Sequence, residues 1–318
     1  MGDLKNRPVT VYRWDDAGAP SIGTTKASDV INILKKCLVE GYGTKQPLGW
    51  SIPFENISTN KVVFRNSTTD GSGGFVQFWD YDGTNVNSSR IAYKGAVGMV
   101  GLDSFDRDQV RMLLKISTTH LYWVLIGTSR GFWFMTNNSL TTPNGSSNEK
   151  ACFFVGDFES FVTNDVGSFV NIQYPTNVDM TNSSWNYSFD ASVVANSSVA
   201  RVYDTDSSNN SVFYKLDNRY LAGATNLNGV PTVDRIFYKP LIYSPTTTTS
   251  NDRLGVNASI SAINPFYRGT IAGLLNTPQG GYLNQPWPVI ETINGVQHFL
   301  MPGYQFGRNW INMGTWYE

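Results

Sequence analysis

The segment of this sequence that most resembles a catalytic motif is Gly-Thr-Ser-Arg-Gly at residues 127–131. The pattern G-x-S-x-G forms the nucleophile elbow of hydrolases, in which a strand precedes the serine and a helix follows it. Here a strand-like apolar run at residues 121–126 precedes Ser129, and a second strand-like run at 132–136 follows it. The two glycines are therefore expected to form a hairpin turn, which argues against Ser129 as a nucleophile.

General bases and soft metal ligands are scarce. The chain has two histidines, His120 and His298, and each lies beside an apolar, strand-like run. Its two cysteines, Cys37 and Cys152, lie too far apart for a metal-binding pair and are too few for a disulfide framework. Structural roles are the expectation for all four, although a Ser-His-Asp triad depends on a closeness in space that sequence does not reveal.

Clustered carboxylates offer two further kinds of chemistry. The turns at 80–83 (Asp-Tyr-Asp-Gly) and 204–206 (Asp-Thr-Asp) resemble the start of a calcium loop, but the position of its bidentate Glu falls on Ile91 or Lys215. Both are expected to be Asp-rich turns, with an irregular calcium site as the alternative. Asp157 and Glu159 could serve as paired carboxylates for glycoside hydrolysis, but nothing distinguishes them from other pairs. We expect no enzyme activity, no catalytic residue, no cofactor and no metal.

The amino-acid composition favours a protein that packs against other proteins over an enzyme. Charged residues make up 15% of the 318 residues and aromatic residues 14%, whereas about 25% charged residues is usual. The net charge of the chain is −1, so it lacks the positive electrostatic potential that attracts a polyanion. Nucleic acid is therefore not an expected partner. The sequence also lacks an apolar run of about eighteen residues and a signal-peptide pattern at its start, so neither a membrane nor secretion by a signal peptide is expected.

One segment has helical periodicity. Residues 28–40 repeat apolar side chains at Ile31, Leu34 and Leu38, with Ser28 as the expected N-cap and Gly41 as the residue that ends the helix. This predicts one amphipathic helix near the N-terminus.

After this helix, short β-branched and aromatic runs alternate with clusters of Gly, Asn, Ser and Pro, which is typical of all-β proteins. Expected strands are 61–65, 75–79, 90–95, 120–126, 132–136, 151–154, 199–203, 213–216, 235–241 and 298–301. We predict a mainly β fold with β-sandwich or barrel-like domains. The expected domains are 1–160, which contains the helix, and 161–318, which is β-rich with long polar loops and an aromatic C-terminal tail.

The aromatic tail provides the candidate contact residues. Trp310, Trp316 and Tyr317 lie within the last nine residues and must bury their rings on their own domain or on a neighbouring subunit. They are the side chains that we select as candidates for subunit contact.

Several segments, taken in order along the chain, resemble a family of virion structural proteins of tailed bacteriophages. Residues 153–161 contain Gly156, Asp157 and Ser160 in the family's Gly-Asp-x-x-Ser pattern, and residues 268–274 fit its Arg-Gly-x-x-x-Gly-Leu pattern. The other matching segments are 11–20, 37–43, 47–54, 61–66 and 75–78. The chain departs from the family after residue 78, where the family has more acidic residues, and over the polar stretch 176–210.

The resemblance implies a structural component of the phage virion, assembled in the bacterial host cytoplasm, whose partners are other copies of itself and other virion proteins. It carries no catalytic residues over to this chain. A ring of the tail, baseplate or neck is the first expectation, and a capsid decoration protein is the second. A receptor- or glycan-binding module is the alternative from a different class, and a hydrolase follows it.

Overall fold

The computed structural model describes residues 7–23, 25–87, 89–115, 121–141, 151–173, 176–181, 198–217, 236–244, 250–251, 257–258, 265–278, 280–282, 284–302 and 309–317. These residues form four larger β-sheets, two short strand pairs and one α-helix. The predicted mainly β fold with one amphipathic helix near the N-terminus is confirmed.

A five-stranded antiparallel sheet forms the middle layer. Its strands, in spatial order, are β13 (Phe169–Ile172), β11 (Cys152–Asp157), β10 (Gly131–Asn137), β9 (Tyr122–Gly127) and β2 (Thr10–Arg13). In β10, Phe132 and Phe134 point into one hydrophobic core, while Trp133 and Met135 point into another. Because a core lies on each face, these strands are apolar at nearly every position.

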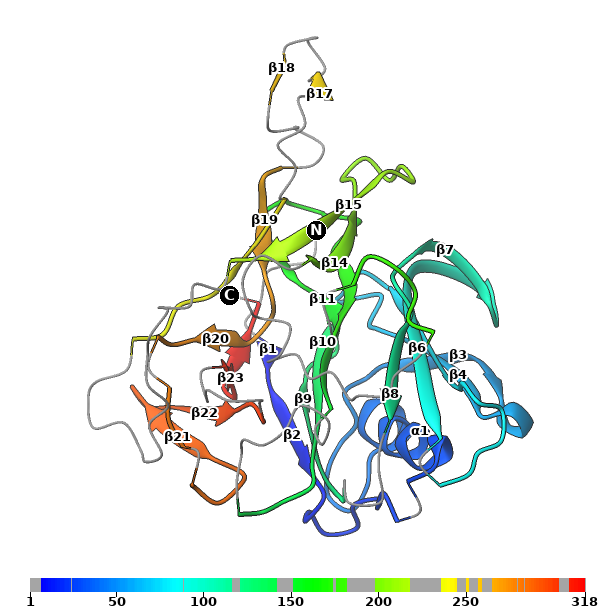
Figure 1. Ribbon diagram of the computed structural model, residues 1–318, viewed down its shortest axis with the longest axis vertical. Helices are drawn as coiled ribbons and strands as arrows, with labels where there is room; N and C mark the ends of the chain where they lie inside the picture. Colours follow the sequence, from blue (N-terminus) through cyan, green and yellow to red (C-terminus); the bar gives the residue numbers. More distant parts are fainter. Residues whose placement is uncertain are drawn as a thin grey trace.

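A six-stranded sheet and the helix cover one face of the middle layer (Figure 1). Hydrophobic side chains from all three contribute to the core between them. The strands, in spatial order, are β3 (Ser51–Asn56), β4 (Lys61–Arg65), β5 (Phe75–Asp80), β6 (Arg90–Gly101) and β7 (Ser104–Asp108), and β8 (Met112–Lys115) also pairs with β6.

Two further sheets lie on the opposite face of the middle layer and share the second core with it. The first consists of β12 (Glu159–Ser160), β19 (Tyr267–Thr270), β16 (Leu241–Tyr243), β15 (Ser211–Leu216) and β14 (Ser198–Tyr203). The second consists of β20 (Leu274–Asn276), β23 (Asn309–Asn312), β22 (Val296–Leu300) and β21 (Ile290–Ile293).

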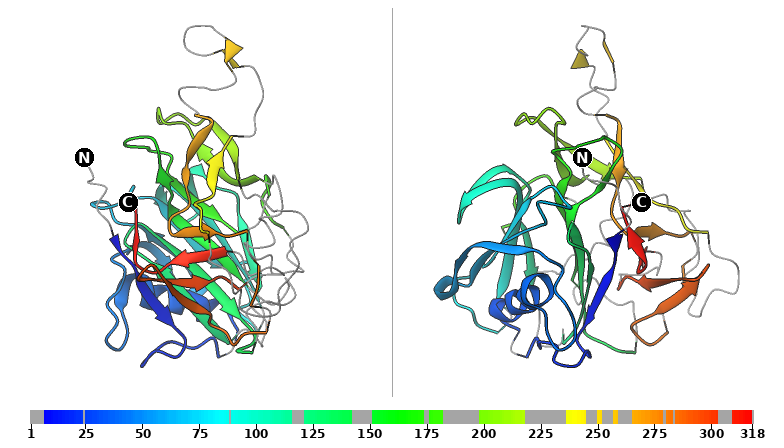
Figure 2. Two further views of the ribbon diagram at one scale, coloured as in Figure 1. Left: turned by 90° about the vertical axis from the view of Figure 1, so that its left-hand side faces the viewer. Right: turned by 180° about the vertical axis from the view of Figure 1, so that it is seen from behind.

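The two ends of the described chain lie side by side. Strand β1 (Arg7–Pro8) pairs with β24 (Thr315–Trp316), which brings residues near both termini to one side of the molecule (Figure 2). The other short pair is β17 (Ser250–Asn251) with β18 (Asn257–Ala258). The β1–β24 pair places the C-terminal tail beside the middle layer.

The helix differs from its predicted bounds at both ends. Helix α1 (Ala27–Lys35) begins one residue before the expected Ser28, which lies inside the helix. The carboxylate of Asp29 accepts a hydrogen bond from the backbone N–H of Lys26 at 3.3 Å, so this carboxylate takes over the capping role. The expected last turn is a π-helix (Lys36–Glu40), and Gly41 ends it with a φ of +81°.

Most predicted strands are present with shifted ends. The prediction 61–65 matches β4, and 90–95 extends to the longer β6. The prediction 235–241 is wrong over residues 236–240, because Tyr238 makes only an isolated bridge and β16 starts at Leu241, directly after Pro240. A proline has no N–H for a strand ladder.

The predicted division at residue 160 stays a prediction. Strand β12 pairs with β19 in an outer sheet, whereas β13, which follows it in sequence, returns to β11 in the middle layer. The chain therefore passes between layers at this point.

Within the described residues, the helix is too short and too polar to cross a membrane.

Candidate functional site

A cleft of about 1230 Å³ opens beside the segment that joins the middle layer to β12 and β13. Its walls come from the turn after β4 (70–72), the β9–β10 turn at Arg130, residues 158–166, and Thr270 of β19. Tyr317, near the C-terminus, also lines it. Segments from both halves of the sequence therefore build this site.

One wall of the cleft depends on the close approach of β12 and β19. Glu159 pairs with Thr270 and Ser160 pairs with Gly269, and the Thr270 hydroxyl donates to the Glu159 carboxylate at 2.9 Å. A Cβ atom on Gly269 would lie 2.1 Å from the Glu159 carbonyl oxygen, so only glycine allows this approach. These strands belong to the two segments that carry the Gly-Asp-x-x-Ser and Arg-Gly-x-x-x-Gly-Leu patterns.

A buried ion pair holds the loop that follows β12. Arg268 donates from Nε and Nη2 to the two carboxylate oxygens of Asp165, both at 2.7 Å. Asp165 also accepts from the Ser160 hydroxyl at 2.6 Å and from the Gly167 N–H at 2.9 Å. A carboxylate with this many donors fixes the loop between residues 160 and 167.

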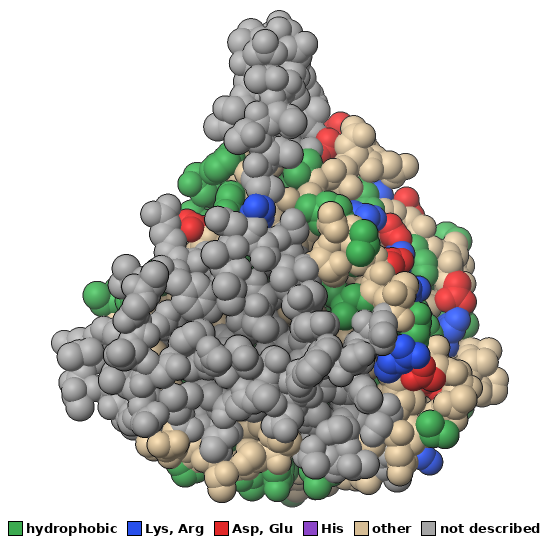
Figure 3. Space-filling model, in the orientation of Figure 1, with side chains coloured by type: hydrophobic (Ala, Val, Ile, Leu, Met, Phe, Trp, Pro, Cys, Tyr) green, Lys and Arg blue, Asp and Glu red, His purple; other side chains and the backbone are tan. Residues whose placement is uncertain are grey.

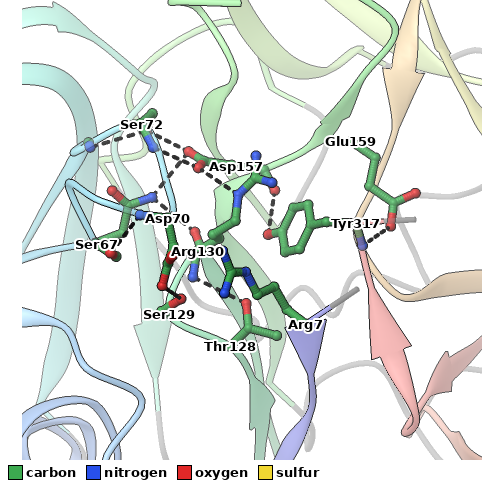
Figure 4. Close-up of polar contacts among 12 residues, drawn as sticks. Arg7, Ser67, Asp70, Ser72, Thr128, Ser129, Arg130, Asp157, Glu159 and Tyr317 are labelled. Atoms are coloured by element: carbon green, nitrogen blue, oxygen red, sulfur yellow. Dashed lines mark hydrogen bonds and ion pairs between the residues drawn. The ribbon is translucent and has the colours of Figure 1, made fainter. Parts of the chain in front are cut away.

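A second buried carboxylate, Asp157, lies at the end of β11 (Figure 4). It accepts from the Ser72 hydroxyl at 2.5 Å, the Ser72 N–H at 2.9 Å, the Asn66 amide at 3.1 Å and Arg130 Nε at 3.4 Å. Burial raises its pKa, and Arg130 and Ser72 oppose that rise. The contacts connect the β4–β5 turn to the middle layer.

Tyr317 closes this cluster from the C-terminal side (Figure 4). Its hydroxyl donates to the Asp157 carbonyl at 2.8 Å, and its backbone N–H donates to Glu159 at 3.0 Å. The guanidinium of Arg130 lies 3.9 Å from the centre of its ring, within cation–π range. Burial raises the pKa of Tyr317 well above its usual value, so the phenol stays a neutral donor.

The Ser129 motif forms a hairpin turn, as predicted. Gly127 and Phe132 are paired across β9 and β10, so a strand follows the serine where an elbow requires a helix. The Ser129 hydroxyl donates to Asp70 at 3.3 Å, and Asp70 is also paired with Arg7. No histidine lines the described cleft.

The histidines are not brought to this site. His120 lies outside the described residues. His298 is buried in β22, with its ring 5.0 Å from that of Phe237, and burial lowers its pKa. Cys37 and Cys152 are both buried, and neither is part of a disulfide.

The two Asp-rich turns bind their own backbone. Asp80 accepts from the N–H of Asp82 at 3.2 Å, and Asp206 accepts from that of Ser208 at 3.0 Å in the β14–β15 turn. Across the described ranges, no three His, Cys, Asp or Glu side chains gather as metal ligands would.

The suggested carboxylate pair takes part in structural contacts. Asp157 is fully buried among its donors, and Glu159 contacts Lys239 at 3.1 Å as well as Thr270 and Tyr317. Both carboxylates are thus held by protein groups.

The three candidate contact aromatics lie inside this chain. Trp310, Trp316 and Tyr317 are each 1% exposed or less. Trp316 donates its indole N–H to the Asn312 carbonyl at 2.7 Å and lies against Gly273. We expected these rings to be buried either in their own chain or against a neighbouring subunit. In the structure they are buried in their own chain.

Arg268, Asp165 and Arg130 were not singled out by type and spacing as site residues. The signal for Arg268 is its place in the segment 268–275, which meets the segment 153–161 at the cleft as β19 and β12. Asp165 and Arg130 lie outside both segments. Which residue each of these charged side chains pairs with depends on tertiary contacts, however, which the sequence does not reveal.

No family model matches this chain, and no curated protein matches it either.

Proposed function

We propose that this protein is a structural component of a tailed phage virion and that it acts through contacts with copies of itself and with other virion proteins. The segments that resemble virion proteins support the proposal. The proposal includes no enzymatic step.

The outer face of the six-stranded sheet supports a contact role most directly. The β6–β7 hairpin folds over this face, where Val63, Phe75 and Met99 belong to a small apolar cluster. At its tip Val100 is 87% exposed, and Ile57, in the turn before β4, is 77% exposed. Exposed apolar side chains next to an apolar cluster are suited to burial by a neighbouring subunit.

Several charges around this face are paired within the chain, whereas Arg65 lies over the ring of Phe75. Asp103, next to the hairpin tip, pairs with Lys61 at the start of β4 at 2.7 Å and accepts from Gln77 at 2.8 Å. Lys94 pairs with Asp108. On this side of the molecule, Lys and Arg side chains lie next to Asp and Glu (Figure 3). These pairs reduce the charge that a neighbouring subunit would meet.

The edges of this sheet favour side-chain contacts over strand addition. Strands β3 and β7 form its two ends. Pro53 removes a donor from β3, and Arg107 has a φ of +50° in β7. Both features interrupt a regular edge.

A tail, baseplate or neck ring is our first placement in the particle, and capsid decoration is the second. Closed rings repeat one contact around an axis, and the exposed apolar side chains of this face would provide such a contact.

Sedimentation velocity of the purified protein tests the contact role. We expect an oligomer that the double substitution Ile57→Asp and Val100→Asp dissociates at least about tenfold more readily, since each substitution places a charge in an apolar contact. Ile236→Asp is the matched control, because Ile236 is 67% exposed but lies outside this sheet. A protein that stays monomeric, or an oligomer insensitive to the double substitution, would contradict the proposal.

A further inference from the structure

We propose that the cleft beside β12 and β19 binds a neutral oligosaccharide, with Phe161 as the ring on which a sugar stacks. This binding activity goes beyond the proposed structural role and does not depend on it.

The charges of the cleft cancel within the protein. Six charged side chains line it, three acidic and three basic, and each has an ion-pair partner in this chain. The six are Asp70, Arg107, Arg130, Glu159, Asp165 and Lys239. Since no charge is left over, the cleft offers an ionic ligand no counter-charge.

Hydrogen-bonding groups remain along the same walls. The hydroxyls of Thr163 and Ser207 and the amide of Asn164 line the cleft. Ser72 and Thr270 also line it, but their hydroxyls already donate to Asp157 and Glu159, so toward a ligand they can act only as acceptors. Hydroxyls and amides both donate and accept, which matches a ligand made of hydroxyl groups. The 41% exposed Lys239 side chain, paired with Glu159 at 3.1 Å, adds a charged donor beside a charged acceptor.

Phe161 provides the apolar part of the site. It lines the cleft and is 60% exposed. The apolar body of a pyranose ring packs on an aromatic face, as other apolar groups do. A phenylalanine left this exposed beside a polar cleft is therefore suited to stacking on a sugar.

The loop that carries Phe161 is already rigid. The Phe161 N–H donates to the Arg268 carbonyl at 2.8 Å, and the Val162 N–H donates to the Ser160 hydroxyl at 3.1 Å. The Asp165–Arg268 pair anchors the far end of the loop. These contacts fix the backbone of the loop, so little backbone entropy is lost when a ligand binds against Phe161.

Size and topology favour a sugar chain over a smaller ligand or a peptide. At about 1230 Å³ the cleft exceeds the range of roughly 300–1,000 Å³ usual for small-molecule pockets. The sheet edge at the cleft is β12, which has two residues and is too short to pair with an added peptide strand.

A glycan array and calorimetry on the full-length protein test this inference. The array carries neutral, sialylated, sulfated and uronate-containing oligosaccharides, and the strongest neutral binder is then titrated against the variants. We expect binding to neutral chains, an affinity loss of roughly tenfold in Phe161→Ala, and retained binding in Phe161→Trp. Tyr267→Ala is the matched control, because Tyr267 is 47% exposed but does not line the cleft.

Three results would overturn the inference: no neutral oligosaccharide bound, a preference for acidic glycans, or equal affinity in Phe161→Ala. Thermal unfolding of each variant checks that the fold is retained. Since this test does not measure assembly, its failure would leave the proposed virion role standing.

Discussion

Arg268 and Asp165 form a buried ion pair although 103 positions separate them, with two contacts of 2.7 Å. The pair joins β19 to the loop after β12, and so it connects the second of the family-like segments to the loop that follows the first. The same contact holds the loop on which Phe161 stands, so the architecture of the cleft and the stability of the fold depend on one interaction.

Replacing Asp165 by Asn should be strongly destabilising, because it leaves the Arg268 guanidinium buried without a counter-charge. Breaking such a pair costs about 3–5 kcal/mol of unfolding free energy. Glu40→Gln is the control, since the Lys36–Glu40 pair is exposed and worth at most about 0.5 kcal/mol. Urea denaturation measures both, and similar losses in the two variants would show that Asp165 is not the anchor.

A methyl group at Gly269 should separate β12 from β19. Its Cβ would lie 2.1 Å from the Glu159 carbonyl oxygen, so Gly269→Ala is expected to lower the unfolding free energy by more than about 2 kcal/mol. Gly101→Ala serves for comparison, because a Cβ there meets nothing within 4 Å. Equal denaturation midpoints would refute the close approach.

Trp316 should act as a core residue of the isolated chain. Trp316→Ala empties a buried site against Gly273 and should cost about 3–5 kcal/mol of unfolding free energy. Val100→Ala, at an exposed position, should change it by less than about 0.5 kcal/mol. If Trp316→Ala instead weakened oligomers while the chain kept its stability, the ring would belong to a subunit contact.

His298 should make the fold sensitive to mild acid. Burial lowers the pKa of His298 below its ordinary 6.5, so the unfolded chain binds its proton at a higher pH than the folded chain does. The stabilising contribution is present above pH 6.5 and is lost as the pH falls from there through the lowered pKa. Denaturation of His298→Gln at several pH values should show a flatter slope than wild type, and an unchanged slope would contradict burial of the neutral ring.

Ser129→Ala should have no effect on ester hydrolysis. Its hydroxyl contacts Asp70 at 3.3 Å in a hairpin turn, Asp70 is itself paired with Arg7, and no histidine is among the residues described around the cleft. An assay with a chromogenic ester measures this, and activity that disappears in the variant would restore the hydrolase alternative.

The sequence predicts the elements whose patterns are local. Strand β4 and the hairpin at Ser129 follow from apolar runs and glycines. Strand β3 was missed because it is largely exposed and contains Pro53, and β7 because charged residues fill it. The end of the helix is π-helical where Leu38 enters the core, and the apolar repeat in the sequence has no feature that distinguishes a π-helix from an α-helix.

The candidate site was less predictable than the fold. Trp316 and Tyr317 are conspicuous in sequence, yet both are buried. Phe161 is unremarkable in sequence, yet it stands 60% exposed at the cleft. Whether an aromatic side chain is buried or exposed depends on which sheets pack against it, and this packing is not visible in the sequence.

Quantitative mass spectrometry of purified phage particles tests the structural role most directly. If the protein builds a closed ring, it should be present at a few to a few tens of copies per particle, in a whole-number ratio set by the symmetry, and a decoration protein would reach hundreds. Absence of the protein from purified particles would contradict a virion role.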